Sequence, residues 1–178
     1  SNISSFNYRP HWGFTGGSTK GQLGGFKQSS LIENGVNSYK VESFGGFANG
    51  GNSVPFNELE LYLMGFIPSS SVSEFDVFSD ITSFSSSGSE FNFSANSRIT
   101  HDGKSIENLL GKRIPNSNNS QKNFKLLIVV LTNKTLTDEQ WDKVDATAEW
   151  FSKKEDDGTH LYNFWEATNG IGSITIEN

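Results

Sequence analysis

The sequence predicts an α+β fold in a single domain, and three observations lead to this prediction. Helical patterns and strand patterns both occur, but they do not alternate in the regular way that a parallel βαβ sheet requires. The length of 178 residues fits one domain. The 15 Phe, four Trp and four Tyr supply a core rich in rings, since each buried aromatic side chain removes about 150–250 Å² from water.

The first third of the chain is dense in glycine. Eleven of the 18 glycines lie between residues 11 and 52, and aromatic residues such as Phe14, Phe26 and Phe47 are interleaved with them. Glycine permits backbone conformations with positive φ and close approach of the backbone to its neighbours. We therefore expect glycine-rich loops held in place by aromatic rings.

A short amphipathic helix is predicted over residues 57–66. Asn57 can cap this helix, and Glu60 at the third helical position completes a capping-box pair. The apolar residues follow helical spacing and predict one buried face, made of Leu59, Tyr62, Leu63 and Phe66. Tyr62 is interpreted as a packing residue on this face.

Further helices are predicted over residues 105–110 and 138–154, with an additional helical turn over 162–167. Gly111 ends the first of them. The second begins with a capping-box pattern at Thr137. Its apolar face is expected to be buried and consists of Trp141, Val144, Ala148 and Phe151.

A buried central strand is predicted over residues 124–132, because the segment FKLLIVVLT is almost continuously apolar and rich in β-branched residues. Weaker alternation of apolar and polar residues indicates three more strands. The apolar positions of these strands are Phe75 and Val77, Phe91 and Phe93, and Ile174 and Ile176.

Composition excludes several classes of function. The net charge of −6 argues against a nucleic-acid partner. The longest apolar run, residues 126–131, is far shorter than the roughly 20 residues of a membrane helix, so no membrane insertion is predicted. The absence of cysteine excludes disulfides, thiolate zinc sites and a cysteine nucleophile.

The surface and the start of the chain suggest an exported protein and a longer parent. Charged residues make up only 19% of the chain, while Ser, Asn and Gly are plentiful. This balance is typical of proteins that are secreted or lie on the cell surface. Residues 1–10 are polar and lack a signal-peptide pattern, and we interpret the chain as a fragment or C-terminal subdomain of a longer protein.

The sequence lacks the common catalytic motifs. Its three histidines, His11, His101 and His160, include no pair at the spacing of a zinc-binding HExxH helix. No nucleophile elbow, P-loop, dinucleotide fingerprint or EF-hand loop occurs either. His101 and His160 are interpreted as residues without a special role. Residues 156–158 (Asp-Asp-Gly) are interpreted as a solvated loop, where calcium is a minor alternative.

Six segments nevertheless form an ordered pattern: HWGF at 11–14, GQLGGF at 21–26, FGGFANGGNSVPF at 44–56, ELELYLMGFIP at 58–68, IENLLGKRIP at 106–115 and FWEATNGIGSITI at 164–176. Together these segments resemble the C-terminal part of a family of exported bacterial zincin-like metallopeptidases. In that family an HExxH helix lies upstream of the HWGF-like element, and this chain contains no such helix. Without that helix, the resemblance implies a fragment, a cleaved half or a degenerate relative of a zinc-dependent peptidase, which is not catalytically complete by itself.

The resemblance also implies candidates for a third zinc ligand. Glu60 falls where the family's acidic LYLMG motif places its carboxylate, and His11 is the second candidate. Residues 11–26 and 44–52 are then expected to fold back and bring His11 close to Glu60. The alternatives are that Glu60 only caps its own helix and that His11 is a hydrogen-bonded structural residue.

Partners follow from the same resemblance. Zinc would bind only together with the missing segment, and the substrate would be a protein or peptide. An N-terminal segment of the same protein is another expected partner, and the isolated chain is predicted to be inactive. The alternative function is a non-catalytic extracellular carbohydrate-binding or adhesion module, because Trp and Tyr rings beside Asn, Asp and Gly loops are typical of sugar-binding surfaces.

Overall fold

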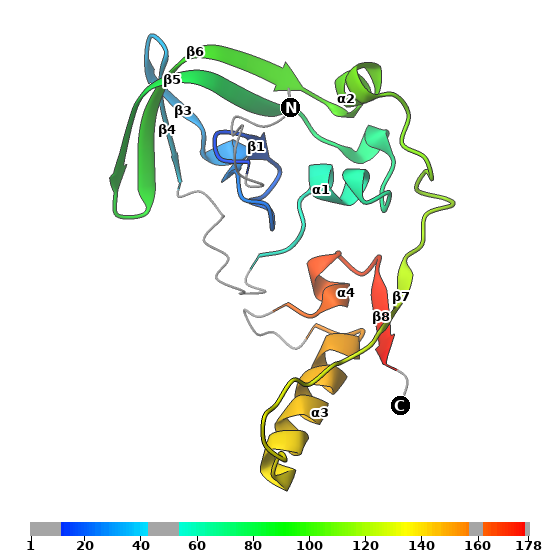
Figure 1. The fold of residues 1–178 in the computed structure, drawn as a ribbon. Helices are drawn as coiled ribbons and strands as arrows, with labels where there is room; N and C mark the ends of the chain where they lie inside the picture. Colours follow the sequence, from blue (N-terminus) through cyan, green and yellow to red (C-terminus); the bar gives the residue numbers. More distant parts are fainter. Residues whose placement is uncertain (1–11, 43–53, 157–161, 177–178) are drawn as a thin grey trace.

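Strands and helices are combined in an α+β fold, which confirms the predicted fold class (Figure 1). The computed structural model describes residues 12–42, 54–156 and 162–176. Within them the strands are β1 (Gly16–Gly17), β2 (Phe26–Lys27), β3 (Ile32–Gly35), β4 (Ser38–Glu42), β5 (Phe75–Ser87), β6 (Glu90–His101), β7 (Asn123–Leu126) and β8 (Ser173–Ile176). The helices are α1 (Glu58–Leu63), α2 (Gly103–Leu110), α3 (Asp138–Ser152) and α4 (Phe164–Ala167), with short 3-10 turns at Gln28–Ser30 and Ser69–Ser71.

The main sheet has four antiparallel strands in the order β3-β4-β6-β5. Its longest pair is the β5–β6 hairpin, which contains the alternating segments predicted as strands. Only Gly88 and Ser89 connect the two strands, and Gly88 has φ of 61°. Glycine suits this position because the tight turns that join hairpin strands need positive φ. Two smaller parallel sheets pair β1 with β2 and β7 with β8.

The glycine-rich first third contains more regular structure than the sequence analysis expected. Two of its segments are the strands β3 and β4 of the main sheet, and two more form β1 and β2. In β4 the side chains of Tyr39 and Val41 are buried against the sheet's core, while their neighbours are more exposed. The prediction of loops is therefore wrong for these strands; residues 43–53 lie outside the described part of the chain.

The core consists of two clusters that share strand β5. One cluster packs the strand against α1 and α2, and its members are Trp12, Leu59, Tyr62, Val72, Phe75, Val77 and Ile106. The other covers the opposite side of the strand with Phe14, Phe26, Tyr39, Val41, Phe78, Phe93 and Ala95. Because successive side chains of a strand point to opposite faces, β5 supplies residues to both clusters. The ring-rich core predicted from composition is thus observed, and Tyr62 packs as expected.

Capping interactions set the starts of the helices. Capping boxes begin α1 at Asn57, α2 at Asp102, α3 at Thr137 and α4 at Asn163. Each capping side chain accepts a hydrogen bond from a backbone N–H that the helix itself leaves without a partner. The four predicted helical segments are confirmed, although α2 begins two residues before the predicted position 105.

The predicted central strand over residues 124–132 is wrong. Only Asn123–Leu126 forms a strand, β7, and its partner is the short strand β8 in a sheet of two. The chain then leaves the sheet and runs beside α3 (Figure 1). Leu127, Val129 and Leu131 are 83%, 68% and 92% exposed. An apolar run carries no information about which strands lie beside it, and those neighbours decide whether it is buried.

Helix α3 also differs from its predicted environment. None of its residues is fully buried, and Trp141 is 46% exposed, so the prediction of a buried apolar face is wrong. The helix packs on β8 and projects from the rest of the molecule together with the chain beside it (Figure 1). The helix is amphipathic in sequence, but its apolar face has few neighbours in the described structure.

Candidate functional site around Glu60

The carboxylate of Glu60 lies at the junction of helix α1 and the glycine-rich loop. The side chain is 3% exposed. Its Oε2 atom accepts hydrogen bonds from the backbone N–H groups of Asn57 at 2.8 Å and Gln22 at 3.0 Å. Its Oε1 atom accepts a third from the N–H of Leu23 at 2.5 Å. A buried carboxylate with three backbone donors therefore ties the loop to the helix.

The loop reaches Glu60 because of its glycines. Gly21 and Gly24 exchange two backbone hydrogen bonds of 3.1 Å, which close a tight turn around Gln22 and Leu23. A Cβ atom on Gly21 would lie only 2.2 Å from Oε2 of Glu60. Residue 21 must therefore be glycine for the backbone to approach the carboxylate this closely. The side chain of Gln22 adds a hydrogen bond from its Nε2 to the carbonyl oxygen of Val54.

Burial and hydrogen bonding act on Glu60 in opposite directions. Burial raises its pKa above the ordinary value, because a charged carboxylate loses its hydration. The hydrogen bonds from Leu23, Asn57 and Gln22 lower the pKa but do not cancel the effect of burial. The site thus holds an acidic group that takes up a proton more readily than an exposed glutamate.

The fit of this arrangement to zinc is limited. A carboxylate offers about four lone-pair positions, and three backbone N–H groups already use three of them at Glu60. Within residues 12–42, 54–156 and 162–176, no group of three or more His, Cys, Asp or Glu side chains could hold a metal ion. The described contacts of Glu60 tie the loop to the helix and leave its carboxylate one lone-pair position, on Oε1.

The described residues include only part of the predicted site. Residues 21–23 fold back onto Glu60, and the predicted capping-box pair of Glu60 with Asn57 is confirmed. The alternative that Glu60 only caps its own helix is wrong, because its carboxylate also accepts hydrogen bonds from Gln22 and Leu23. His11 and residues 44–52 lie outside the described part of the chain, so the approach of His11 to Glu60 stays a prediction. His160 and most of the acidic loop at 156–158 also lie outside it.

A second buried acid was missed by the sequence analysis. Asp76 on β5 is 1% exposed and accepts hydrogen bonds from Arg98 at 3.0 Å and Thr100 at 2.6 Å. Gln28 adds a third at 2.5 Å. Burial alone would raise the pKa of Asp76, but these hydrogen bonds hold it below its ordinary value. The only signal in the sequence is one acid inside the apolar string Phe-Asp-Val-Phe, which in a strand demands a partner.

His101 ends strand β6 immediately before the cap of α2. Its Nδ1 lies 3.2 Å from the hydroxyl of Ser105, and its ring lies 5.8 Å from that of Phe75. Its Nε2 is buried and has no hydrogen-bond partner among the described residues. These contacts place His101 at a junction of strand and helix.

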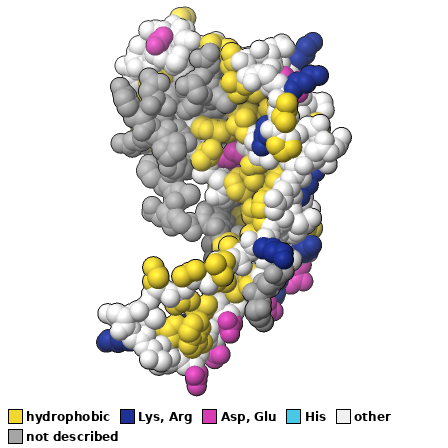
Figure 2. Space-filling view, turned by 45° about the vertical axis from the view of Figure 1, so that its right-hand side comes forward, with side chains coloured by type: hydrophobic (Ala, Val, Ile, Leu, Met, Phe, Trp, Pro, Cys, Tyr) yellow, Lys and Arg dark blue, Asp and Glu magenta, His cyan; other side chains and the backbone are white. Residues whose placement is uncertain are grey.

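A hollow at the other end of the molecule separates α3 from the chain that follows β7. Its volume is about 580 Å³, and it is bordered by Ile128 and Val130 on one side and by Trp141, Asp145 and Glu149 on the other. Figure 2 shows hydrophobic side chains gathered on the lower, projecting part of the molecule, with acidic side chains along its edge. The sequence did not predict this hollow, because Trp141 was expected to be buried.

Comparison of the chain with protein-family models, with curated proteins and with solved structures finds no match. In the described part of the chain, no helix combines the length and the apolar character that crossing a membrane requires. The fold and the site thus define an α+β protein with a buried glutamate that anchors a glycine-rich loop.

Proposed function

We propose that this chain is the C-terminal portion of a secreted zinc-dependent metallopeptidase-like protein and is not catalytically complete alone. The observation that supports the proposal is the contact at Glu60. The two most distinctive segments of the resemblance, GQLGGF at 21–26 and ELELYLMG at 58–65, meet there, because the backbone N–H groups of Gln22 and Leu23 donate hydrogen bonds to the Glu60 carboxylate. Two segments that follow the order of the family's motifs along the chain are therefore also in contact in this fold.

In this proposal the upstream HExxH segment supplies the reaction centre, and this chain packs beside it. Zinc bound by an HExxH helix would activate a water molecule for attack on a peptide carbonyl. Within this chain, Glu60 holds the Gln22–Leu23 backbone against α1, and one lone-pair position of its Oε1 remains for a further bond. Glu60 and His11 remain the candidates of this chain for a third ligand.

The proposal is tested by comparing the isolated chain with the longer protein. We expect the purified 178-residue chain to leave casein and fluorogenic peptides intact with or without added zinc. The longer protein, produced with its upstream region, should contain an HExxH sequence and cleave these substrates until a chelator is added. Chelator-sensitive cleavage by the isolated chain, or an upstream region without HExxH, would contradict the proposal.

The exposure of Trp141 favours a second candidate function, a carbohydrate-binding module. An indole ring that is 46% exposed beside Asp145 and Glu149 offers a stacking face next to hydrogen-bond acceptors, as sugar recognition requires. If this function holds, the chain should bind members of a glycan array, and Trp141→Ala should abolish that binding. Val36→Ala, at an exposed apolar position in the turn between β3 and β4, is the matched control. A wild-type chain that ignores all glycans removes this candidate.

A further inference from the structure

A pocket of about 460 Å³ lies between helix α1, the 3-10 turn Ser69–Ser71, helix α2 and the chain that follows α2. Figure 1 shows these elements together at the end of the molecule away from α3. Gly103 lets α2 approach the turn, because a Cβ at this position would collide with the carbonyl oxygen of Ser69. The chain after α2 is bound to α1, since Nε of Arg113 donates a hydrogen bond of 2.9 Å to the carbonyl oxygen of Leu63. Packed elements therefore form the walls of the pocket.

One wall of the pocket carries a carboxylate that is only partly used. Glu107 of α2 lines the pocket and is half-buried. Its Oε1 atom accepts a hydrogen bond of 2.8 Å from the hydroxyl of Ser69, and no described residue donates to its Oε2 atom. An ionised carboxylate can accept about four hydrogen bonds. Glu107 can therefore bind a further donor, and an ammonium group forms one of the stronger hydrogen bonds of this kind.

Two cationic side chains follow α2 and line the same pocket, Lys112 and Arg113. Arg113 uses its Nε and Nη1 atoms for the carbonyl oxygens of Leu63 and of the two residues that follow Arg113. Its Nη2 atom has no acceptor within the described part of the chain. Lys112 is exposed and forms no ion pair with a described residue. These donors are therefore available to an anionic group.

The hydroxyl group of Tyr62 lies near both kinds of charge. Its side chain is 4% exposed, and the hydroxyl accepts a hydrogen bond from the backbone N–H of Arg113. Burial raises the pKa of Tyr62 and the charge of Glu107 raises it further, while the hydrogen bond and the charge of Arg113 lower it. The hydroxyl therefore keeps its proton and can donate it to a ligand. Because both charges act on this one hydroxyl, a single small molecule can reach Glu107 and Arg113 together.

We propose that this pocket binds a free α-amino acid with an apolar side chain, in its zwitterionic form. The ammonium group donates to Oε2 of Glu107, and the carboxylate accepts hydrogen bonds from Nη2 of Arg113 and from the hydroxyl of Tyr62. Lys112 adds attraction for the carboxylate. A simple anion would be repelled by Glu107, and a simple amine would be repelled by Lys112 and Arg113. A zwitterion instead pairs each of its charges with an opposite one, and this difference gives the selectivity.

Apolar side chains line the rest of the pocket and suit the side chain of such a ligand. They are Ile67, Pro68 and Ile114. Ile114 is 85% exposed, so a ligand side chain packed on it would remove apolar surface from water. Small-molecule sites commonly combine an apolar lining with a few polar groups in this way. The site is separate from the contact at Glu60, because Glu60 and Tyr62 point about 200° apart around helix α1.

The first experiment titrates the isotope-labelled 178-residue chain with four ligands and follows its backbone amide signals by NMR. L-Leucine should shift the signals of α2 and of residues 112–117 and leave those of α3 unchanged. Leucinamide lacks the carboxylate and N-acetyl-leucine lacks the ammonium group, so each should bind at least about 10-fold more weakly. Glycine should also bind more weakly than leucine, because it has no apolar side chain.

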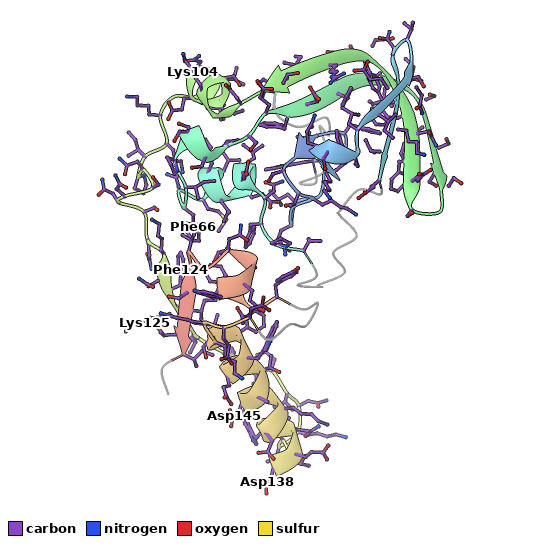
Figure 3. All side chains as sticks on the ribbon, turned by 180° about the vertical axis from the view of Figure 1, so that it is seen from behind. Phe66, Lys104, Phe124, Lys125, Asp138 and Asp145 are labelled. Atoms are coloured by element: carbon purple, nitrogen blue, oxygen red, sulfur yellow. The ribbon has the colours of Figure 1, made fainter. Side chains whose placement is uncertain are left out.

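The second experiment assigns the two charges of the ligand to their partners. Glu107→Gln should weaken leucine binding at least about 10-fold and leave N-acetyl-leucine binding unchanged, because only leucine carries the ammonium group. Lys112→Gln should weaken leucine binding and leave leucinamide binding unchanged. Lys104→Gln is the control, since Lys104 lies on the outer side of α2 and does not line the pocket (Figure 3). Glu107→Gln keeps an acceptor for the hydroxyl of Ser69, and circular dichroism checks that each variant folds.

Three results would overturn the inference. They are a wild-type chain whose signals do not respond to leucine up to about 10 mM, equal affinity for leucine and for either of its singly charged derivatives, and a loss in Glu107→Gln that is the same for leucine and N-acetyl-leucine. The last result would mean that Glu107 shapes the pocket without binding the ammonium group. None of these measurements depends on zinc or peptidase activity, so the inference and the proposed function stand or fall separately.

Discussion

Glu60 shows how one residue connects distant parts of the chain. Its carboxylate satisfies the cap of its own helix through Asn57 and, in addition, binds the amides of Gln22 and Leu23, 38 and 37 residues earlier. A carboxylate that accepts hydrogen bonds from backbone amides forms stronger hydrogen bonds than a neutral acceptor does. The residue therefore stabilises the loop as well as the helix, and its burial explains its raised pKa.

Glu60→Gln should lower the free energy of unfolding by about 2 kcal/mol. The amide group of glutamine would turn an N–H donor toward at least one of the three backbone donors, so a buried N–H loses its acceptor. Urea denaturation measures the change. The matched control is Glu58→Gln on the same helix, whose carboxylate accepts one exposed bond from Ser73 at 2.8 Å. Equal losses for the two variants would contradict the role assigned to Glu60.

Glu60 and Asp76 should affect the pH dependence of stability with opposite sign. The pKa of Asp76 is lowered in the folded state, so its stabilising effect is present above the unfolded value of 3.8 and is lost as pH falls through the folded value. The pKa of Glu60 is raised, so its linked stability is present below the unfolded value of 4.5 and is lost as pH rises through the folded value.

The lowered pKa of Asp76 predicts how the effect of Asp76→Asn on the free energy of unfolding depends on pH. The difference in free energy of unfolding between wild type and variant should be largest near neutral pH and shrink on acidification below about pH 4, because protonated Asp76 no longer attracts Arg98. Denaturant titrations between about pH 6 and pH 2 provide the measurement. A difference that stays constant over this range would show that the ion pair with Arg98 does not lower the pKa of Asp76.

At the scale of elements, strand β5 organises the core because it contributes to both clusters. Phe78 is fully buried, and its ring lies 4.5 Å from that of Tyr39 and 5.1 Å from that of Phe93. Phe84, further along the same strand, is 50% exposed and stacks on Phe91 of the partner strand at 5.4 Å. The same residue type thus occupies two environments on one strand.

Phe78→Ala should destabilise the protein by about 3–5 kcal/mol, because it removes a buried ring and leaves a cavity between the packed aromatics. Phe84→Ala is the control from the same strand and should cost clearly less, since much of its ring already contacts water. Thermal or urea unfolding of both variants tests the comparison. A loss at Phe84 as large as that at Phe78 would contradict the assignment of Phe78 to the core and of Phe84 to the surface.

At the scale of the whole molecule, three rings join the C-terminal part to the rest. Phe66, just after α1, lies 6.3 Å from Phe124 of β7 and 6.4 Å from Phe164 of α4, and the last two are 5.7 Å apart. Figure 3 shows Phe66 and Phe124 one above the other between α1 and the β7–β8 pair. Gly172 permits this packing, because a Cβ there would approach the rings of Phe164 and Phe66 to 2.7 and 2.8 Å.

Phe124→Ala should loosen the β7–α3–α4–β8 part of the molecule while leaving the main sheet intact. Amide hydrogen exchange should become faster in β8 and α4 and stay unchanged in β5 and β6, because stability is distributed among local units. Lys125→Ala, the neighbouring position on the same strand, is the control and should leave exchange in α4 unchanged. Equal acceleration across β5 and β6 would show that the two parts unfold together.

Local patterns made much of the fold predictable. Asn57 and Thr137, each with a partner three positions later, predicted the starts of α1 and α3, because the necessary contacts lie within one turn of sequence. The alternation in β5 and β6 likewise identifies strands. Strands β3 and β4 were missed because glycine and polar residues surround Tyr39 and Val41, and only pairing with β6 gives these short segments their structure.

The sequence by itself determined the fold class, the helices, the ring-rich composition of the core and the capping role of Glu60. Only the tertiary structure decided that the amides of Gln22 and Leu23 converge on Glu60, that Asp76 meets Arg98, and that the apolar segment 127–131 lies exposed beside α3. The physical reason is the separation along the sequence between the residues that interact. Hydrogen bonds between near neighbours depend on residue type and spacing, whereas burial and long-range pairing depend on the path of the chain between them.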